Sequence, residues 1–282
     1  MINVIINADD LGKDHVVNAE INNALQKHLI TSSTILANSN YWDEVHHVVA
    51  NNPDASFGVH LNLTEGKALT DSPIFHELDI VNDSNCFTKK IHTLTDCSEE
   101  LQEAVFKEWD AQVNKVIETE GIEATHFDGH HHIHTKWEFR TVLLKLLKKY
   151  NINKVRNRCV VPYSKLKLFA VSCINNAAKS DFVFNYVEKR KTSSSFFRTC
   201  NLYMESFRWR LLFQKNGIAM SDYFDAYENW VKMLGNGIKC PDNTIVELMC
   251  HPGHPNYQNE YEKIIQNKMP QNKYNLISFK DI

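Results

Sequence analysis

Two adjacent carboxylates stand at the end of the first apolar run of the chain. Asp9 and Asp10 directly follow the run of residues 4–8. Because two like charges side by side repel each other, such a pair needs a nearby cation or a shared proton. The pair therefore indicates a site for positive charge, although a single Asp after a strand can also cap the following helix.

Histidines follow two further apolar runs. His60 ends a run that begins at residue 55, and residues 126–134 hold five histidines together with Asp128. Carboxylate and imidazole are both ligands of divalent metals in proteins. Such a cluster also suits proton transfer, and a surface histidine cluster without function is the alternative. The sequence thus predicts a divalent metal site with acid and base groups beside it.

His251 ends the last strongly apolar run, residues 245–250, and precedes a Pro-Gly pair. A turn at that pair would fix the chain direction and can hold the imidazole toward a cleft. We therefore interpret His251 as a general acid or base, with a purely structural role as the alternative.

The segments between these residues alternate in periodicity, which predicts a parallel sheet in an α/β fold. Strands are expected at residues 2–8, 33–37, 55–63, 124–128, 153–156 and 245–250. Helices are expected around residues 17–29, 42–49, 101–116, 142–147, 224–234 and 261–265, and a long loop at 64–98. In parallel α/β folds, loops at the carboxyl ends of the strands converge on one face. Distant polar strand ends are therefore expected to share one site.

Length and composition limit the possible functions. The 282 residues, 43% of them hydrophobic, suffice for one catalytic domain over residues 1–282, with an insertion or lid expected around residues 159–222. The 31 basic and 34 acidic residues nearly cancel, so no global field favours nucleic acid or anionic lipid. No apolar run reaches the roughly 20 residues that span a bilayer. Seven single cysteines and the lack of a leader-like start favour a cytoplasmic protein.

The ordered set of motifs resembles the YdjC-like family of carbohydrate deacetylases, which includes bacterial chitooligosaccharide deacetylases. The segments that carry the resemblance are NADDLG at 7–12, TSST at 31–34, HLNLTEG at 60–66, THFDGHHHIH at 125–134, SDYF at 221–224 and ELMCHPG at 247–253. The resemblance runs nearly end to end. Family members commonly have Ser, Phe, Pro and His where this chain has Gly129, Leu11, Ala68 and Tyr223, and these differences bear on substrate preference.

The resemblance implies a distorted (β/α) barrel, similar to a TIM barrel with inserted loops. It also implies one divalent ion, Mg²⁺ or Zn²⁺, held by Asp10, His60 and His130, with Asp9 as the catalytic base. The implied activity is metal-dependent hydrolysis of an N-acetyl group on a small amino sugar or chitooligosaccharide. The partner is then a small N-acetylated sugar, and the oligomeric state, including a homodimer, is left open.

Four further side chains receive roles within this interpretation. His251 is the candidate acid that protonates the departing amine, with His132 and His134 as alternatives that could instead bind sugar hydroxyls. Asp128 is expected to accept a hydrogen bond from a ligand imidazole and so fix its tautomer.

Two other functions remain open at this point. A metal-dependent phosphoesterase on a similar barrel would normally use two metals and more carboxylates. A sugar-binding or metal-buffering protein without catalysis would keep the cluster but turn nothing over. The ligand types suit zinc, whereas the family is often described with magnesium, so the metal also stays open.

Overall fold

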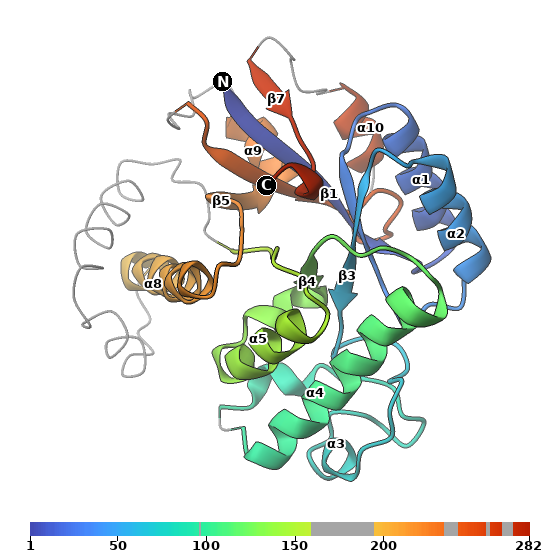
Figure 1. The fold of residues 1–282 in the computed structure, drawn as a ribbon, viewed down its shortest axis with the longest axis vertical. Coiled ribbons are helices and arrows are strands. Elements are labelled where there is room, and N and C mark those ends of the chain that lie inside the picture. Colours follow the sequence, from blue (N-terminus) through green and yellow to red (C-terminus); the bar gives the residue numbers. More distant parts are fainter. Residues whose placement is uncertain (96, 159–194, 234–241, 258–259, 267–272) are drawn as a thin grey trace.

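Parallel strands in one curled sheet form the centre of the molecule (Figure 1). The computed structural model describes residues 1–95, 97–158, 195–233, 242–257, 260–266 and 273–282. The strands are β1 Ile2–Leu11, β2 Ser32–Ile35, β3 Ser56–Leu61, β4 Phe127–Gly129, β5 Tyr223–Ala226, β6 Ile245–Cys250 and β7 Tyr274–Leu276. Their order is β4-β3-β2-β1-β6-β5, and β7 pairs with β1.

Strand β1 is central because it has neighbours along both edges. It pairs with β6 along one edge, whereas β7 and then β2 lie end to end along the other. Every residue of β1 from Val4 to Leu11 is buried, as expected for a strand covered on both faces. The carboxylate pair Asp9 and Asp10 therefore lies in the buried part of the central strand.

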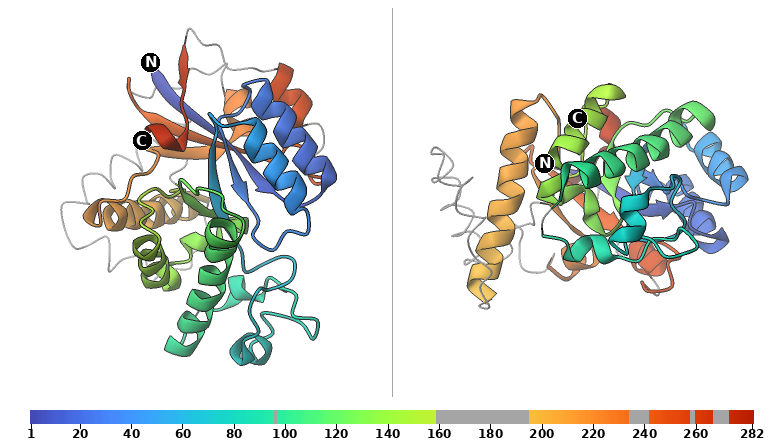
Figure 2. Two further views of the ribbon diagram at one scale, coloured as in Figure 1. Left: turned by 45° about the vertical axis from the view of Figure 1, so that its right-hand side comes forward. Right: turned by 90° about the horizontal axis from the view of Figure 1, so that it is seen from below.

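Helices cover the outside of the sheet. They are α1 His15–Gln26, α2 Trp42–Asn51, α3 Pro73–Glu77, α4 Glu99–Asn114, α5 Arg140–Lys149, α8 Ser195–Lys215, α9 Tyr227–Met233 and α10 Glu260–Gln266. Single helical turns are η1 Lys90–Thr93, η2 Lys115–Thr119, η3 His130–Thr135, η4 Trp137–Phe139 and η7 Phe279–Asp281. Figure 2 shows α1, α2 and α10 on one flank and α4 with α5 on another. No helix among the described residues is long and apolar enough to cross a lipid bilayer.

Local sequence explains where the main helices begin. Asp14 accepts a hydrogen bond from the backbone of Val17 and caps α1, and Ser98 accepts one from Leu101 and caps α4. Apolar side chains at helical spacing then face the sheet, as in Val17, Ile21, Ala24 and Leu25 of α1, all of which are buried. The loops that carry the polar strand ends are thus held by well-anchored neighbours.

The edges of the sheet approach each other through isolated bridges. Phe127 of β4 bridges Val155, and Lys154 bridges Ala219, which lies four residues before β5. The expected α/β class and parallel sheet are confirmed. The curled half-barrel fits the expected distorted barrel, but the described residues do not amount to a complete TIM barrel.

Several expected elements differ from the observed ones. Residues 224–226 belong to strand β5, so the expected helix at 224–234 was wrong at its start, because Tyr223 to Ala226 pair with β6. Residues 153–156 form only bridges, and the expected loop at 64–98 includes α3 and η1. Of the expected insertion at 159–222, residues 159–194 lie outside the described chain, and the single-domain organisation stays a prediction.

Candidate metal centre

A bulge in β1 places the two adjacent carboxylates at one site. The pairing of β1 with β2 changes register between Ala8 and Leu11, and Asp10 has a φ of 73°. A left-handed conformation is uncommon for a residue other than glycine and is typical of functional sites. In a regular strand Asp9 and Asp10 would face opposite sides, whereas here both join one cluster of polar groups.

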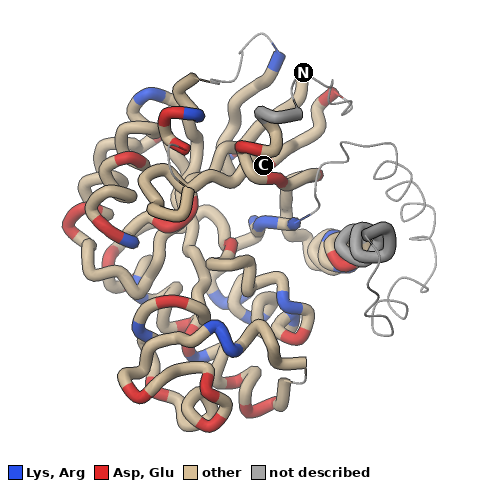
Figure 3. Tube along the Cα trace, turned by 180° about the vertical axis from the view of Figure 1, so that it is seen from behind, with Lys and Arg blue, Asp and Glu red and all other residues tan. Residues whose placement is uncertain are grey.

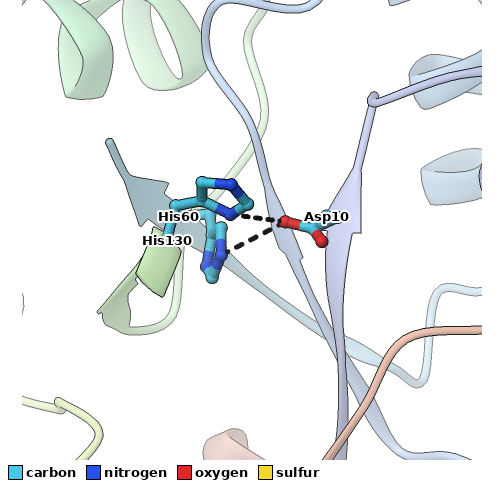
Figure 4. Close-up of side chains that lie close together, drawn as sticks. All are labelled: Asp10, His60 and His130. Atoms are coloured by element: carbon cyan, nitrogen blue, oxygen red, sulfur yellow. Dashed lines mark ion pairs between the residues drawn. The ribbon is translucent and has the colours of Figure 1, made fainter. Parts of the chain in front are cut away.

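Three strand ends bring Asp10, His60 and His130 together (Figure 4). Oδ1 of Asp10 lies 2.8 Å from Nδ1 of His130 and 3.4 Å from Nε2 of His60. One potential ligand atom from each residue lies within 4.8 Å of the others, and all three side chains are buried. Strands β3 and β4 are paired here, with His60 opposite Asp128 and Leu61 opposite Gly129, so the register sets this spacing.

The donor set fits a divalent cation. Oδ1 of Asp10 is buried and accepts no hydrogen bond, although both imidazoles are in contact range. A buried carboxylate oxygen without a partner is destabilising unless a cation or proton compensates it. Three protein ligands also leave positions open for water and substrate, as in hydrolytic sites.

The charges around the cluster favour a cation as well. Burial alone would lower the pKa of His60, yet Asp128 and Asp10 raise this pKa to about 10. Burial alone would raise the pKa of Asp10, but His130 and His60 hold it well below its usual range. The carboxylates therefore draw protons onto the imidazoles, and a divalent ion could replace those protons.

Asp128 lies directly behind His60. Its Oδ1 is 2.6 Å from Nδ1 of His60, and its Oδ2 accepts a hydrogen bond from Thr34 at 3.0 Å. A carboxylate that accepts the Nδ1 proton leaves Nε2 with its lone pair directed toward Asp10. That Asp128 fixes the tautomer of His60 stays a prediction, and this contact is compatible with it.

Arg156 was missed by the sequence analysis, although it anchors the site. The fully buried guanidinium forms two hydrogen bonds with Asp9, at 2.6 and 2.7 Å, and contacts Asp128 at 2.9 Å and Glu247 at 2.5 Å. Burial alone would raise the pKa of Asp9, but Arg156 lowers it to about 2. Asp9 is therefore held ionised in a fixed orientation, next to the cluster that contains Asp10.

His251 lies beside the carboxylate pair because β6 is paired with β1. Ala8 is opposite Cys250, so His251 follows at the level of Asp9. Its ring stacks on Tyr257, with ring centroids 4.0 Å apart and planes 6° apart, and its backbone N–H donates to Glu260 at 2.5 Å. Burial lowers the pKa of His251, and Asp9 and Asp10 oppose that shift. The stacking and the backbone hydrogen bond therefore orient the imidazole, and the charges of Asp9 and Asp10 act on it.

The remaining histidines of the cluster are dispersed, as expected for a strand that ends near Asp128. His132 is in van der Waals contact range of Phe224, with ring centroids 5.4 Å apart, and burial holds its pKa well below the usual range. His134 is fully buried and contacts the carbonyl of Arg156 at 3.2 Å. His126 stacks on Phe279 in the core at 3.6 Å. The structure thus brings His130 together with Asp10 and His60, and it places His134 and His126 in the surrounding packing.

The sequence contained only weak indications of the site residues that the sequence analysis missed. Glu247 interrupts an otherwise apolar strand, and a charged residue there implies a buried partner. Thr34 and Glu65 stand within segments that carry the family resemblance, without any pattern of their own. Arg156 gave no signal by itself because only the fold brings it to three carboxylates.

Fold and site together define a class of protein: an α/β protein with a buried Asp-His-His cluster, suited to one divalent ion, at the carboxyl ends of parallel strands. A family model described as YdjC-like protein matches residues 3–276. The chain therefore belongs to the YdjC-like family.

The chain is similar to curated proteins that are named carbohydrate deacetylase. A carbohydrate deacetylase from Halalkalibacterium halodurans is 34% identical over 53% of this chain and 61% of its own length. One from Vibrio parahaemolyticus is 31% identical over 53% of this chain and 57% of its own length. One from Listeria monocytogenes serotype 4b is 28% identical over 66% of this chain and 75% of its own length. The matched part thus spans about six tenths of the length of the first two. All three relatives carry the name carbohydrate deacetylase.

The fold recurs in a solved structure. An Enterococcus faecalis V583 protein, described as a candidate for cellobiose-phosphate cleavage, has a TM-score of 0.63 and 21% identity, with 99% of this chain and 98% of that chain covered. At this identity the likeness concerns the fold alone.

Proposed function

We propose that this protein is a metal-dependent hydrolase that removes the acetyl group from an N-acetylated amino sugar or chitooligosaccharide. The observation that carries the proposal is the buried Asp10, His60 and His130 cluster, with a carboxylate oxygen that accepts no hydrogen bond and with Asp9 beside it. The curated relatives named carbohydrate deacetylase support the substrate class. Cytoplasmic placement stays a prediction.

Asp10, His60 and His130 would hold one Mg²⁺ or Zn²⁺ ion. When bound, such an ion polarises the amide carbonyl and lowers the pKa of water. Asp9 then serves as the general base, because Arg156 fixes its carboxylate and keeps it ionised. Its pKa of about 2 makes it a weak base, so it can only accept a proton from a strongly acidified water.

His251 would protonate the departing amine. The stacking on Tyr257 and the hydrogen bond from its backbone to Glu260 hold the ring next to Asp9. His132 and His134 are the alternatives, but His134 is fully buried and already contacts the carbonyl of Arg156. His251 therefore has better access to a substrate than His134, with 8% of its surface exposed against none, whereas His132 stays the alternative.

A single ion is favoured over the two ions of a phosphoesterase site. Among the described residues, Asp9, His60 and Asp128 form a second potential ligand group, and Glu65, His130 and His131 a third. In the second group, Asp9 and Asp128 already bind Arg156. In the third, Glu65 is paired with Lys13. A second ion would have to compete with a resident cation in either place.

The charge distribution suits a small, nearly neutral substrate. Figure 3 shows Lys and Arg interspersed with Asp and Glu along the chain in that view. The net charge of the sequence is −3. Neither feature favours nucleic acid or an anionic membrane as a partner.

Acetate release from a panel of N-acetylated mono- and disaccharides tests the proposal. We expect acetate with added Mg²⁺ or Zn²⁺, none with chelator, and none from His60→Ala with either ion. The control variant is His46→Ala, because His46 is exposed, pairs with Glu120 and belongs to none of the candidate ligand groups. Rapid cleavage of a phosphate ester without acetate would replace this proposal, and sugar binding without turnover would indicate a binding protein.

A further inference from the structure

A second carboxylate lies behind the other candidate ligand histidine. Oε2 of Glu65 is 3.0 Å from Nε2 of His130, whose Nδ1 lies 2.8 Å from Oδ1 of Asp10. Asp128 stands in the same relation to His60, at 2.6 Å from the nitrogen that faces away from Asp10. Each imidazole is therefore placed between Asp10 and a carboxylate of its own.

The loop after β3 fixes the backbone of Glu65. The carbonyl of Glu65 accepts hydrogen bonds from the side chains of Asn62, at 2.6 Å, and Asn38, at 2.9 Å. Its backbone N–H donates to Asn62 at 3.2 Å, and Gly66 follows with a φ of 75°. An Asn that binds the backbone two and three residues ahead is a turn-forming motif. The side chain of Glu65 therefore starts from a fixed point.

Lys13 anchors the other end of this side chain. It forms an ion pair with Oε1 of Glu65, leaving Oε2 for His130, and its backbone N–H donates to the carbonyl of Asp10 at 3.0 Å. Glu65 is thus a fixed carboxylate, and the turn that holds its counter-ion also carries Asp10.

We propose that Glu65 is a positioning residue for the ion, holding His130 with Nε2 protonated and Nδ1 free to bind the metal. Lys13 orients Glu65 through the ion pair between them. A ligand histidine commonly donates its second N–H to a carboxylate, which fixes the tautomer and the ring plane. This inference rests on the proposed function, because it assumes that His130 is a ligand.

Glu65 differs from Asp128 in one testable respect. The side chain of Glu65 is 46% exposed, whereas Asp128 is fully buried and also binds Arg156. Substitution of Glu65 therefore removes a half-exposed carboxylate, whereas substitution of Asp128 would disrupt a fully buried ion pair, so an effect of Glu65 on the ion is easier to separate from an effect on folding. The ion pair between Glu65 and Lys13 can also be disrupted from either side, by a substitution at Glu65 or by one at Lys13.

The test is the dissociation constant of Zn²⁺ for the whole protein, measured by competition with a chelator. Loss of a carboxylate behind a ligand histidine typically weakens metal binding about 10- to 100-fold, which is our expectation for Glu65→Ala. Glu65→Gln should bind more tightly than Glu65→Ala, because its amide oxygen still accepts from Nε2–H. Lys13→Met should cause a smaller loss than Glu65→Ala.

Glu120→Gln is the matched control. Glu120 also joins a histidine and a lysine, with His46 at 2.9 Å and Lys115 at 2.5 Å, but away from the cluster. The control should keep wild-type affinity, and the melting temperature of metal-free Glu65→Gln should match wild type. Wild-type affinity in Glu65→Ala, or an equal loss in Glu120→Gln, would overturn the inference. Equal affinity in wild type and His130→Ala would instead refute the metal site itself.

Discussion

Arg156 illustrates how a single residue sets the chemistry of its neighbours. Its guanidinium contacts carboxylates from three strands, Asp9 of β1, Asp128 of β4 and Glu247 of β6. Removal of one partner from a buried ionic network leaves an uncompensated charge, which is strongly destabilising. Asp9 and Asp10 therefore have different surroundings despite being adjacent, because Arg156 forms an ion pair with Asp9.

This difference predicts separable effects at the carboxylate pair. Asp9→Asn should retain the metal and lose about 10² to 10⁴ in kcat, since a general base typically contributes that much. Asp10→Asn should instead lose the metal. Elemental analysis and steady-state kinetics on both variants give the comparison, and metal loss in Asp9→Asn would make Asp9 a ligand.

His251 provides a prediction of pH dependence. Burial lowers the pKa of His251 below its ordinary value of 6.5, so the protonated acid is depleted as the pH rises through that lowered pKa. We expect kcat/KM of the wild type to fall on this limb of the profile. His251→Ala should lose about 10² to 10⁴ in kcat, keep the metal, and lack the limb. His47→Ala, on the exposed face of α2, is the control.

Normal kcat in His251→Ala would return the acid role to His132 or His134. A limb that survives in a slow His251→Ala would assign that titration to another group.

At the scale of elements, the sequence predicted most of what positions the site. Apolar runs ending on Asp10, His60 and Asp128 indicated parallel strands with converging ends, and register then placed the side chains together. Segments with weak periodicity were less predictable. The expected helix at 224–234 begins as β5 because residues 223–226 pair with β6, and that long-range contact leaves no mark on local periodicity.

We expect substitution of Gly58 to be destabilising, because β3 and the segment before β4 approach each other closely at this residue. A Cβ there would lie 2.6 Å from the His126 ring and 2.7 Å from its carbonyl oxygen, so Gly58→Ala must push the two segments apart. We expect a loss of about 1 to 3 kcal/mol in unfolding free energy, as for overpacked cores, and weaker metal binding, because His60 is two residues away.

Gly121→Ala separates these two effects. Its Cβ would meet nothing within 4 Å, but its φ of 68° strains an alanine. Denaturant unfolding should show a loss of about 1 to 2 kcal/mol, with metal affinity unchanged. Unaltered metal affinity in Gly58→Ala would show that the spacing of these segments does not set the geometry of the site.

At the scale of the whole molecule, buried charge links stability to pH. Burial raises the pKa of Glu247 to about 7, although Arg156 opposes the shift. The unfolded chain loses this proton near pH 4.5, whereas the folded protein keeps it up to about pH 7. The contribution of Glu247 to stability is therefore present below about pH 4.5 and is lost as the pH rises toward 7.

Glu247→Gln should remove this pH dependence. Its amide oxygen can still accept from Arg156, but it has no proton to lose. The unfolding free energy of the variant relative to wild type should rise between pH 4.5 and 7, by on the order of 3 kcal/mol at full effect. Urea unfolding at several pH values measures this difference, and a difference that is constant with pH would contradict the prediction.

The proposed deacetylase function depends on one divalent ion bound at Asp10, His60 and His130. The most direct measurement is acetate release as Zn²⁺ or Mg²⁺ is titrated into chelator-treated protein, at a protein concentration well above the metal dissociation constant. We expect the activity to rise linearly and to level off at one equivalent of ion. Activity that needs two equivalents, or no acetate at any metal concentration, would contradict it.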